Sequence, residues 1–282
     1  MRVFPVLLGS FVAADNWAVL IATSTGWSNY RHGANVLSVY QNIRRLGIPD
    51  RNIIVMLAED FDANRRNILQ DRIYCEPTCK NNINADSTVD YKNEETTAES
   101  VFSVLTDTDP TAPDCRRLRT DENSRILVYV TGHGVESFIN IGSEGDVGAS
   151  DFSNIFSAMH AAKRYKEILF IADTCQAYSL FEEITAPGII AISSSDTTKP
   201  SLSSHINRRV GSHASDELTY LLYLYLSRLD KESPATLGGL WEEIQSAGFE
   251  SCPRLYTTDG TRALSRIRAT DFFGKQSDRA PV

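Results

Sequence analysis

A thiol and an imidazole each stand just after a short apolar run of this 282-residue sequence. His133 follows the run at residues 126–130, and Cys175 follows the run at residues 168–172. An imidazole can take the proton of a thiol near neutral pH and later return it to a leaving amine. A buried cysteine alone is usually a small hydrophobic residue, and a lone histidine is usually structural. Their joint placement favours a cysteine nucleophile with a histidine base.

Two glycines, Gly132 and Gly134, flank His133. A residue without a side chain lets the backbone come close to a substrate. We therefore expect the backbone amides of Gly134 and Cys175 to form an oxyanion hole for a tetrahedral intermediate.

The apolar runs that precede these residues belong to a set of five without period-two alternation, which is typical of strands buried on both faces of a parallel sheet. The segments between them carry apolar residues at helical spacing. Strand and helix alternate, so the sequence predicts an α/β fold, and ligands of such sheets collect at the carboxyl ends of the strands. The predicted strands are residues 17–22, 53–57, 126–130, 168–172 and 189–192.

Two further helices are predicted after the last of these strands, over residues 218–229 and 237–244. Residues 63–96 are rich in Asn, Asp and Glu and predict a long surface excursion. Residues 1–14 resemble a short signal peptide, because an apolar stretch ends in two alanines. An ordinary first strand or a tail is the alternative. We expect one catalytic domain over residues 15–282.

Composition excludes some functions. The formal net charge is −8 and the 28 Lys and Arg residues form no long block, so a nucleic-acid partner is not expected. The longest later apolar stretch, residues 218–229, is shorter than the ~20 residues of a membrane-spanning helix. The cysteine count is five, so at least one thiol stays unpaired in an oxidising compartment. The pairing of the other four, Cys75, Cys79, Cys115 and Cys252, is left open.

Six motifs are spread over nearly the whole chain: residues 16–21 (NWAVLI), 29–32 (NYRH), 46–50 (LGIPD), 129–134 (YVTGHG), 173–176 (DTCQ) and 270–274 (TDFFG). Together they resemble the catalytic subunits of glycosylphosphatidylinositol (GPI)-protein transamidases, which are caspase- and legumain-like cysteine enzymes. Legumains, the asparaginyl endopeptidases, share the NYRH motif and the His-Gly element of the fourth motif, whereas DTCQ and TDFFG are typical of the transamidase branch.

The resemblance implies a caspase-like, mostly parallel central sheet with helices on both faces, and it implies catalytic roles for Cys175 and His133. It adds Asn29 as a third catalytic residue, whose side-chain amide would orient the imidazole. A local hydrogen bond within the loop is the other interpretation of Asn29. By the same resemblance, Arg31 and Ser194 lie at the pocket for the residue under attack, although Arg31 could instead be a surface cation and Ser194 a strand end.

No cofactor is expected for catalysis, but the resemblance implies a structural calcium site formed by Asp50, the backbone of Ile53, and Asp90. Oxygen ligands suit that ion. Thr88 stands where a further carboxylate is expected, which removes a charged ligand.

Two other departures concern Val135 and Ala63. Val135 replaces the second glycine usual after the histidine, so we expect this loop to lack the freedom of a glycine at positive φ. Ala63 replaces the cysteine that bridges to a partner subunit in many relatives, so the partners would be held noncovalently.

The activity implied is cleavage of a carboxy-terminal GPI-attachment signal, with the acyl group passing through a thioester to the ethanolamine amine of the GPI glycolipid. The expected partners are the proprotein signal, the glycolipid and membrane-embedded transamidase subunits, in the endoplasmic reticulum lumen. The alternatives are a legumain-like endopeptidase that resolves the thioester with water and a catalytically silent assembly subunit.

Overall fold

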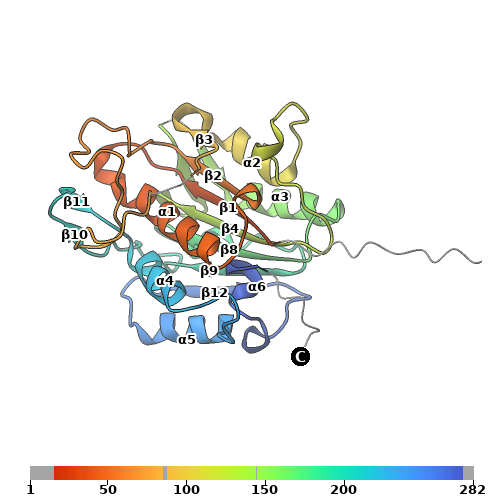
Figure 1. The fold of residues 1–282 in the computed structure, drawn as a ribbon. Coiled ribbons are helices and arrows are strands. Elements are labelled where there is room, and N and C mark those ends of the chain that lie inside the picture. The colour runs from red at the N-terminus through yellow and green to blue at the C-terminus, as the bar shows by residue number, and fades with distance from the viewer. Residues whose placement is uncertain (1–15, 85–87, 144, 276–282) are drawn as a thin grey trace, which may run out of the picture.

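The computed structural model describes residues 16–84, 88–143 and 145–275. Its centre is a seven-stranded sheet in the order β12-β9-β8-β4-β1-β2-β3 (Figure 1). All strands run parallel except β12, which pairs antiparallel with β9 at the edge. The strands are β1 (Asn16–Ala22), β2 (Ile53–Leu57), β3 (Tyr91–Lys92), β4 (Arg125–Thr131), β8 (Glu167–Asp173), β9 (Ile189–Ser193) and β12 (Arg254–Thr257).

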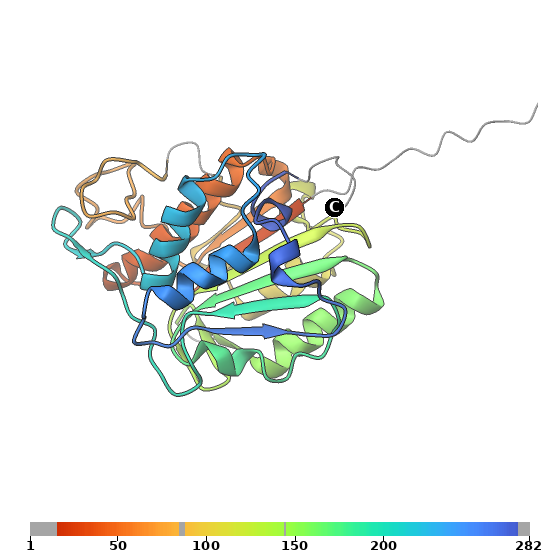
Figure 2. The same cartoon turned by 90° about the horizontal axis from the view of Figure 1, so that it is seen from below.

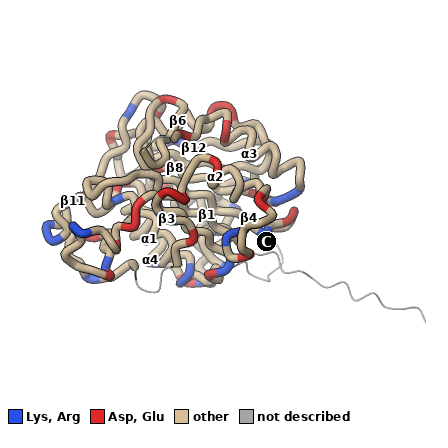
Figure 3. The backbone as a smooth tube through the Cα atoms, turned by 90° about the horizontal axis from the view of Figure 1, so that it is seen from above, with Lys and Arg blue, Asp and Glu red and all other residues tan. Residues whose placement is uncertain are grey.

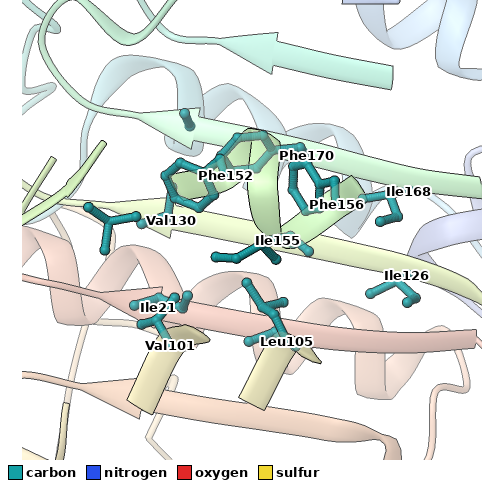
Figure 4. Packing of buried hydrophobic residues seen from close by; sticks show 14 of the residues in the cluster. Ile21, Val101, Leu105, Ile126, Val130, Phe152, Ile155, Phe156, Ile168 and Phe170 are labelled. Atoms are coloured by element: carbon teal, nitrogen blue, oxygen red, sulfur yellow. The ribbon is translucent and has the colours of Figure 1, made fainter. Parts of the chain in front are cut away.

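Helices cover both faces of the sheet, as predicted. One core lies under α2 and α3, and Figure 4 shows Val101, Leu105 and Ile155 of these helices packed on strand residues such as Ile21 and Val130. The other core lies under the remaining helices, and Figure 2 shows α1, α4 and α5 over that face. The bounds are α1 (Tyr30–Arg45), α2 (Ala98–Thr106), α3 (Ala149–Ala161), α4 (Glu217–Ser227), α5 (Leu237–Ser246) and α6 (Thr270–Phe273).

The five predicted strands are confirmed, with ends that differ by a residue at most. Each is fully buried, which explains why no alternation marks them. The edge strands β3 and β12 were not predicted, because both are short or half-exposed and carry few apolar residues. The helix predicted over residues 237–244 is confirmed as α5.

Small sheets and 3₁₀ turns lie outside the main sheet. A three-stranded antiparallel sheet follows β4 directly, and it is formed by β5 (Gly134–Val135), β6 (Phe138–Ile141) and β7 (Gly145–Gly148). A small antiparallel hairpin pairs β10 (Ile206–Asn207) with β11 (Ser212–His213). The 3₁₀ turns are η1 (Trp27–Asn29), η2 (Asp50–Asn52), η3 (Asn93–Glu95), η4 (Asp114–Arg116), η5 (Ala177–Leu180) and η6 (Leu264–Arg266).

The predicted surface excursion is only partly exposed. Ile73, Cys75 and Ile83 are buried in a third apolar cluster, where they pack with Tyr30 and Ala34 of α1. The excursion therefore anchors itself on the helix that begins at the candidate site. Its residues 85–87 lie outside the described part of the chain.

The structure leaves two expectations about the chain untested and bears on two others, the cysteines and a membrane span. The signal-peptide prediction for residues 1–14 falls outside the described residues, and the single-domain boundaries remain a prediction. All five cysteines carry free thiols in this structure. Among the helices of the described ranges, none is long and apolar enough to cross a membrane.

Candidate active site

Asn29 and His133 meet at the carboxyl edge of the sheet. The side-chain Oδ1 of Asn29 lies 2.8 Å from Nε2 of His133. The Nδ2 of Asn29 donates to the backbone carbonyl of Thr25 at 2.8 Å, which fixes the amide orientation. A carbonyl oxygen only accepts, so Nε2 carries the ring proton and Nδ1 is left as the basic nitrogen. The amide therefore makes the local loop bond and also contacts the imidazole, whereas a catalytic role for Asn29 stays a prediction.

The start of α1 explains why this asparagine is available. Asn29 is the N-cap of α1 but makes no side-chain capping bond, although asparagine usually does so at this position. Its side chain turns away from the helix and towards His133. The helix thus gives up a cap bond at the position where the orienting group is needed.

His133 is fixed through its backbone. Its amide donates to Ser24 Oγ at 3.3 Å, and its carbonyl accepts from Asn140 of β6 at 2.9 Å. The ring packs edge-on against His32, with ring centroids 5.3 Å apart. Although the side chain is exposed on one side, partial desolvation and the nearby charge of Arg31 lower the pKa of His133 below 6.5. The imidazole is therefore neutral at pH 7 and able to take a proton.

Cys175 stands two residues past the end of β8, next to β4 in the sheet. Gln176 follows in the left-handed region with φ 55°, so the chain turns sharply just after the thiol. Thr174 is held on the other side, where its carbonyl accepts from Ser194 Oγ at 3.2 Å and from Ser195 Oγ at 2.7 Å. These bonds fix the backbone on which the half-exposed thiol is carried.

Gly134 lies against the segment of the cysteine. A Cβ built at this position would come within 2.5 Å of Thr174 Oγ1 and 3.2 Å of the Cys175 carbonyl oxygen. Only glycine permits this approach without displacement. The structure thus brings together the two residues whose amides are expected to form the oxyanion hole, a role that stays a prediction.

Val135 corrects one expectation. It lies in the extended strand β5 and pairs with Phe138, and its φ is not positive, so the position has no need of the freedom of a glycine. The positive φ of this turn falls on Ser137 instead, at 65°. The Val135 side chain is 55% exposed, so replacing glycine by valine adds an apolar surface beside the site without straining its backbone.

Arg31 is no isolated surface cation. Its Nε donates to Asp216 at 2.9 Å, and that carboxylate is buried at the start of α4. Asn35 Nδ2 donates to the other oxygen of Asp216 at 2.6 Å. Burial and the charge of Asp173 raise the pKa of Asp216 to about 7, against the opposing effect of Arg31. Arg31 is thus held at the same end of α1 as Asn29.

Sequence patterns did not predict Asp216, Asn35 or His32 as neighbours of the site. One available signal was the aspartate two residues before the amphipathic stretch at residues 218–229, because helices favour aspartate at the N-cap. Burial lowers the pKa of His32 well below 6.5, and the charges of Arg31 and His133 lower it further.

Ser194 is buried and makes two bonds with the backbone of Thr174. Its Oγ accepts from the Thr174 amide at 3.1 Å and donates to the Thr174 carbonyl at 3.2 Å. In this position it supports the cysteine turn. Its contact with a substrate stays a prediction.

The residues expected around calcium lie together near the starts of β2 and β3. Asp50 accepts from the hydroxyls of Tyr40 and Thr88, and Asp90 accepts from the amide of Val55 at 2.9 Å. Burial raises the pKa of Asp90 to about 6. Within the described ranges no group of three or more His, Cys, Asp or Glu side chains is placed to hold a metal. These carboxylates make bonds within the protein and form no complete oxygen cage, so we derive no function through calcium, and calcium binding stays a prediction.

Comparisons with known proteins extend over the same part of the chain. The model of the "Peptidase C13 family" matches residues 16–255. The chain is 37% identical to the GPI-anchor transamidase of Saccharomyces cerevisiae, over 95% of this chain and 66% of the yeast protein. It is 38% identical to that of Schizosaccharomyces pombe, over 94% and 70%, and 36% identical to that of Homo sapiens, over 92% and 66%. The chain therefore spans about two thirds of the length of these relatives.

The fold is similar to that of a solved caspase. Caspase-1 from Spodoptera frugiperda superposes with a TM-score of 0.56 over 95% of this chain and 93% of the caspase, at 11% sequence identity. At that identity the likeness concerns the fold alone, and it confirms the predicted caspase-like α/β architecture. Because the family model and relatives with more than 30% identity both extend over most of it, the chain belongs to the peptidase C13 family of cysteine peptidases.

Proposed function

We propose that this chain is the catalytic subunit of a GPI-anchor transamidase, with Cys175 as nucleophile, His133 as base and Asn29 as the residue that orients the base. The observation that carries the proposal is the 2.8 Å contact between Asn29 Oδ1 and His133 Nε2, on a strand end beside that of Cys175. The names of the relatives in yeasts and human supply the reaction.

In the first half-reaction, Nδ1 of His133 takes the proton of the Cys175 thiol, and the thiolate attacks the carbonyl of the attachment residue. The amides of Gly134 and Cys175 donate to the oxyanion of the tetrahedral intermediate. The imidazolium then returns its proton to the departing amine, and a thioester remains on Cys175. The charge of Arg31 favours the neutral imidazole before the step and lies beside the pocket of the attachment residue.

In the second half-reaction, the ethanolamine amine of the glycolipid attacks the thioester carbonyl. Nδ1 of His133 takes a proton from that amine, and the Cys175 thiolate leaves. Water can attack the same carbonyl, so the difference between a transamidase and a peptidase lies in which nucleophile reaches the thioester. The proposal places the chain in the endoplasmic reticulum lumen, joined to membrane-embedded subunits by noncovalent contacts.

The partition between amine and water tests this function. The purified chain, in complex with its native partners, is incubated with a signal-bearing peptide, with and without hydrazine. We expect a peptide hydrazide when hydrazine is present, because the thioester is exposed to amines. A product that is the free acid under both conditions would contradict the transamidase and support a legumain-like hydrolase.

Complementation with Cys175→Ala addresses catalysis by this subunit. We expect the variant to assemble with its partners and to leave proproteins without an anchor. Restored anchoring by the alanine variant would mean that the chain assembles the complex and does no chemistry.

A further inference from the structure

A polar cavity of about 490 Å³ lies at the carboxyl edge of the sheet, beside the candidate site. This volume is within the range of small-ligand pockets. Four segments line it: the residue stretches that follow β1 and β2, the turn from β3 into α2, and the hairpin from β6 to β7. The lining residues are Thr25, Ala58, Asn93, Glu94, Thr96, Thr97, Ala98, Glu99, Ile141, Gly142, Ser143, Gly145 and Asp146.

Two walls of this cavity are the segments that hold the imidazole. Thr25 contributes the carbonyl that accepts from Asn29 Nδ2 at 2.8 Å. The other wall is β6. The amide of Asn140, next to the lining residue Ile141, donates to the carbonyl of His133 at 2.9 Å. The amide of Gly142 closes the two walls by donating to Thr23 at 2.7 Å. The cavity thus lies on the imidazole side of the site, and we call it the imidazole-side cavity.

The imidazole side is where amines leave and enter. The same imidazole protonates the departing amine and deprotonates the incoming one, so both amines must approach the acyl carbon from its side. The group attached to the incoming amine therefore extends past His133 and Asn29. The cavity is lined by Thr25 and Ile141, which belong to the segments that hold these two residues.

The lining determines which group suits the cavity. Glu94, Glu99 and Asp146 supply carboxylates, and none of them makes an ion pair with a described residue. Figure 3 shows acidic residues near the labels of β3 and α2. Hydroxyls and an amide complete the wall, and there is no lysine or arginine among the described residues that line it. Such a surface suits a hydroxyl-rich group with a protonated amine.

We propose that the imidazole-side cavity binds the head group of the acyl acceptor, a hydroxyl-rich glycan that carries a protonated amine. This inference rests on the proposed function and deepens it, because it gives the chain itself a part in selecting an amine over water.

The test uses Glu94→Gln combined with Asp146→Asn in the full chain with its native partners. Both residues are exposed, so the fold should tolerate the change. Two acceptors are compared: hydrazine, which has no head group, and a synthetic probe in which ethanolamine is joined through its hydroxyl to glucosamine. The matched control is Glu122→Gln combined with Glu242→Gln, which removes two exposed carboxylates far from the cavity, before β4 and on α5.

We expect the cavity variant to raise the KM of the glucosamine probe about three- to tenfold, because two exposed charges each contribute modestly. The KM of hydrazine and the rate of thioester formation should change less than about twofold, as should every value of the control. Equal changes for both acceptors, or no change for the probe, would overturn the inference. Slower thioester formation with an unchanged probe KM would assign the cavity to the departing peptide and overturn it as well.

A separate measurement distinguishes failure of the proposed function. If the wild-type complex forms no amide with either amine, the transamidase proposal fails. In that case, calorimetry of the glucosamine probe with the Cys175→Ala chain still tests whether the cavity binds the probe. Binding that weakens in the cavity variant supports the inference, and binding that is absent or unchanged refutes it.

Discussion

Buried carboxylates have pKa values shifted in opposite directions at the amino and carboxyl edges of the central sheet. At the amino edge, Glu167 at the start of β8 accepts from Arg125 at 2.9 Å and from Arg262 at 2.7 and 2.8 Å. Burial opposes ionisation there, but the two guanidinium groups lower the pKa of Glu167 below its ordinary value. At the carboxyl edge, one guanidinium, that of Arg31, faces Asp216, and burial and Asp173 raise the pKa of Asp216 to about 7.

This difference indicates that the amino edge stabilises the sheet and that the carboxyl edge carries the reactive groups. The amino edge matches charge with charge where β4 and β8 begin side by side, so it holds the register of the strands that carry the site. The carboxyl edge leaves its buried carboxylates undercompensated next to the imidazole and the thiol. Perturbed pKa values of this kind gather at functional sites. Substitutions at the carboxyl edge should therefore change activity first, and those at the amino edge should change stability first.

The largest expected effect is that of Cys175→Ala. Removal of the nucleophile should lower kcat for peptide cleavage at least about a thousandfold, because the oxyanion hole and the base have no bond-forming partner. The thermal midpoint should stay within about 2 °C of wild type, since a half-exposed thiol contributes little packing. An unfolded variant would contradict the expectation that substitutions at the carboxyl edge change activity before stability.

At the amino edge, Arg125→Ala should lower the free energy of unfolding by about 2–3 kcal/mol. Breaking a buried ion pair costs about 3–5 kcal/mol, and Arg262 still compensates part of the Glu167 charge. Urea denaturation measures the loss. Arg228→Ala is the matched control, because its ion pair with Glu243 is exposed and should contribute less than about 1 kcal/mol. An equal loss of unfolding free energy in both variants would contradict a stabilising role of the amino edge.

The third effect concerns Asn29→Ala, which leaves base and nucleophile in place. Without the amide, the imidazole loses its fixed tautomer and orientation, and kcat/KM should fall about ten- to a hundredfold, less than the whole contribution of acid–base catalysis. Steady-state kinetics with a signal peptide give the value. An unchanged kcat/KM would reduce Asn29 to a loop residue.

A smaller effect is the pH dependence of stability from Asp216. Its pKa is about 7 in the folded protein and about 3.9 when unfolded. Between these values the folded state holds a proton that the unfolded state lacks, so raising the pH destabilises the fold. From pH 5 to pH 8, the thermal midpoint of Asp216→Asn relative to wild type should rise by about 2–4 °C. A flat difference for Asp216→Asn would contradict the raised pKa.

The smallest effect is expected in the pH profile of Arg31→Gln. Loss of the cation should raise the pKa of His133 towards 6.5, although desolvation still holds it below. The acid limb of kcat/KM against pH should therefore move upward, and activity at pH 5.5 should fall relative to pH 7.5. Arg65→Gln, an exposed cation in the excursion, should leave the limb in place. A downward movement would contradict the electrostatic effect of Arg31.

Much of the fold was predictable, because fully buried parallel strands are continuous apolar runs and the helices between them are amphipathic. The strand ends that carry His133 and Cys175 followed from that pattern. The edge strands β3 and β12 did not, because a short or half-exposed strand has little apolar signal. The positive φ of Ser137 in place of residue 135 could not be predicted, because a turn's dihedral angles depend on the pairing that surrounds it.

The sequence by itself determined the chemistry-bearing residue types, their places after two neighbouring strands and the family that their motifs resemble. These depend on local patterns that survive without coordinates. Only the tertiary structure decided that one Asn29 amide bonds both Thr25 and His133, that Arg31 faces a buried Asp216 from α4, and that a polar cavity opens beside the imidazole. Each of these joins segments far apart in the chain, and such contacts exist only once the sheet has brought its carboxyl edge together.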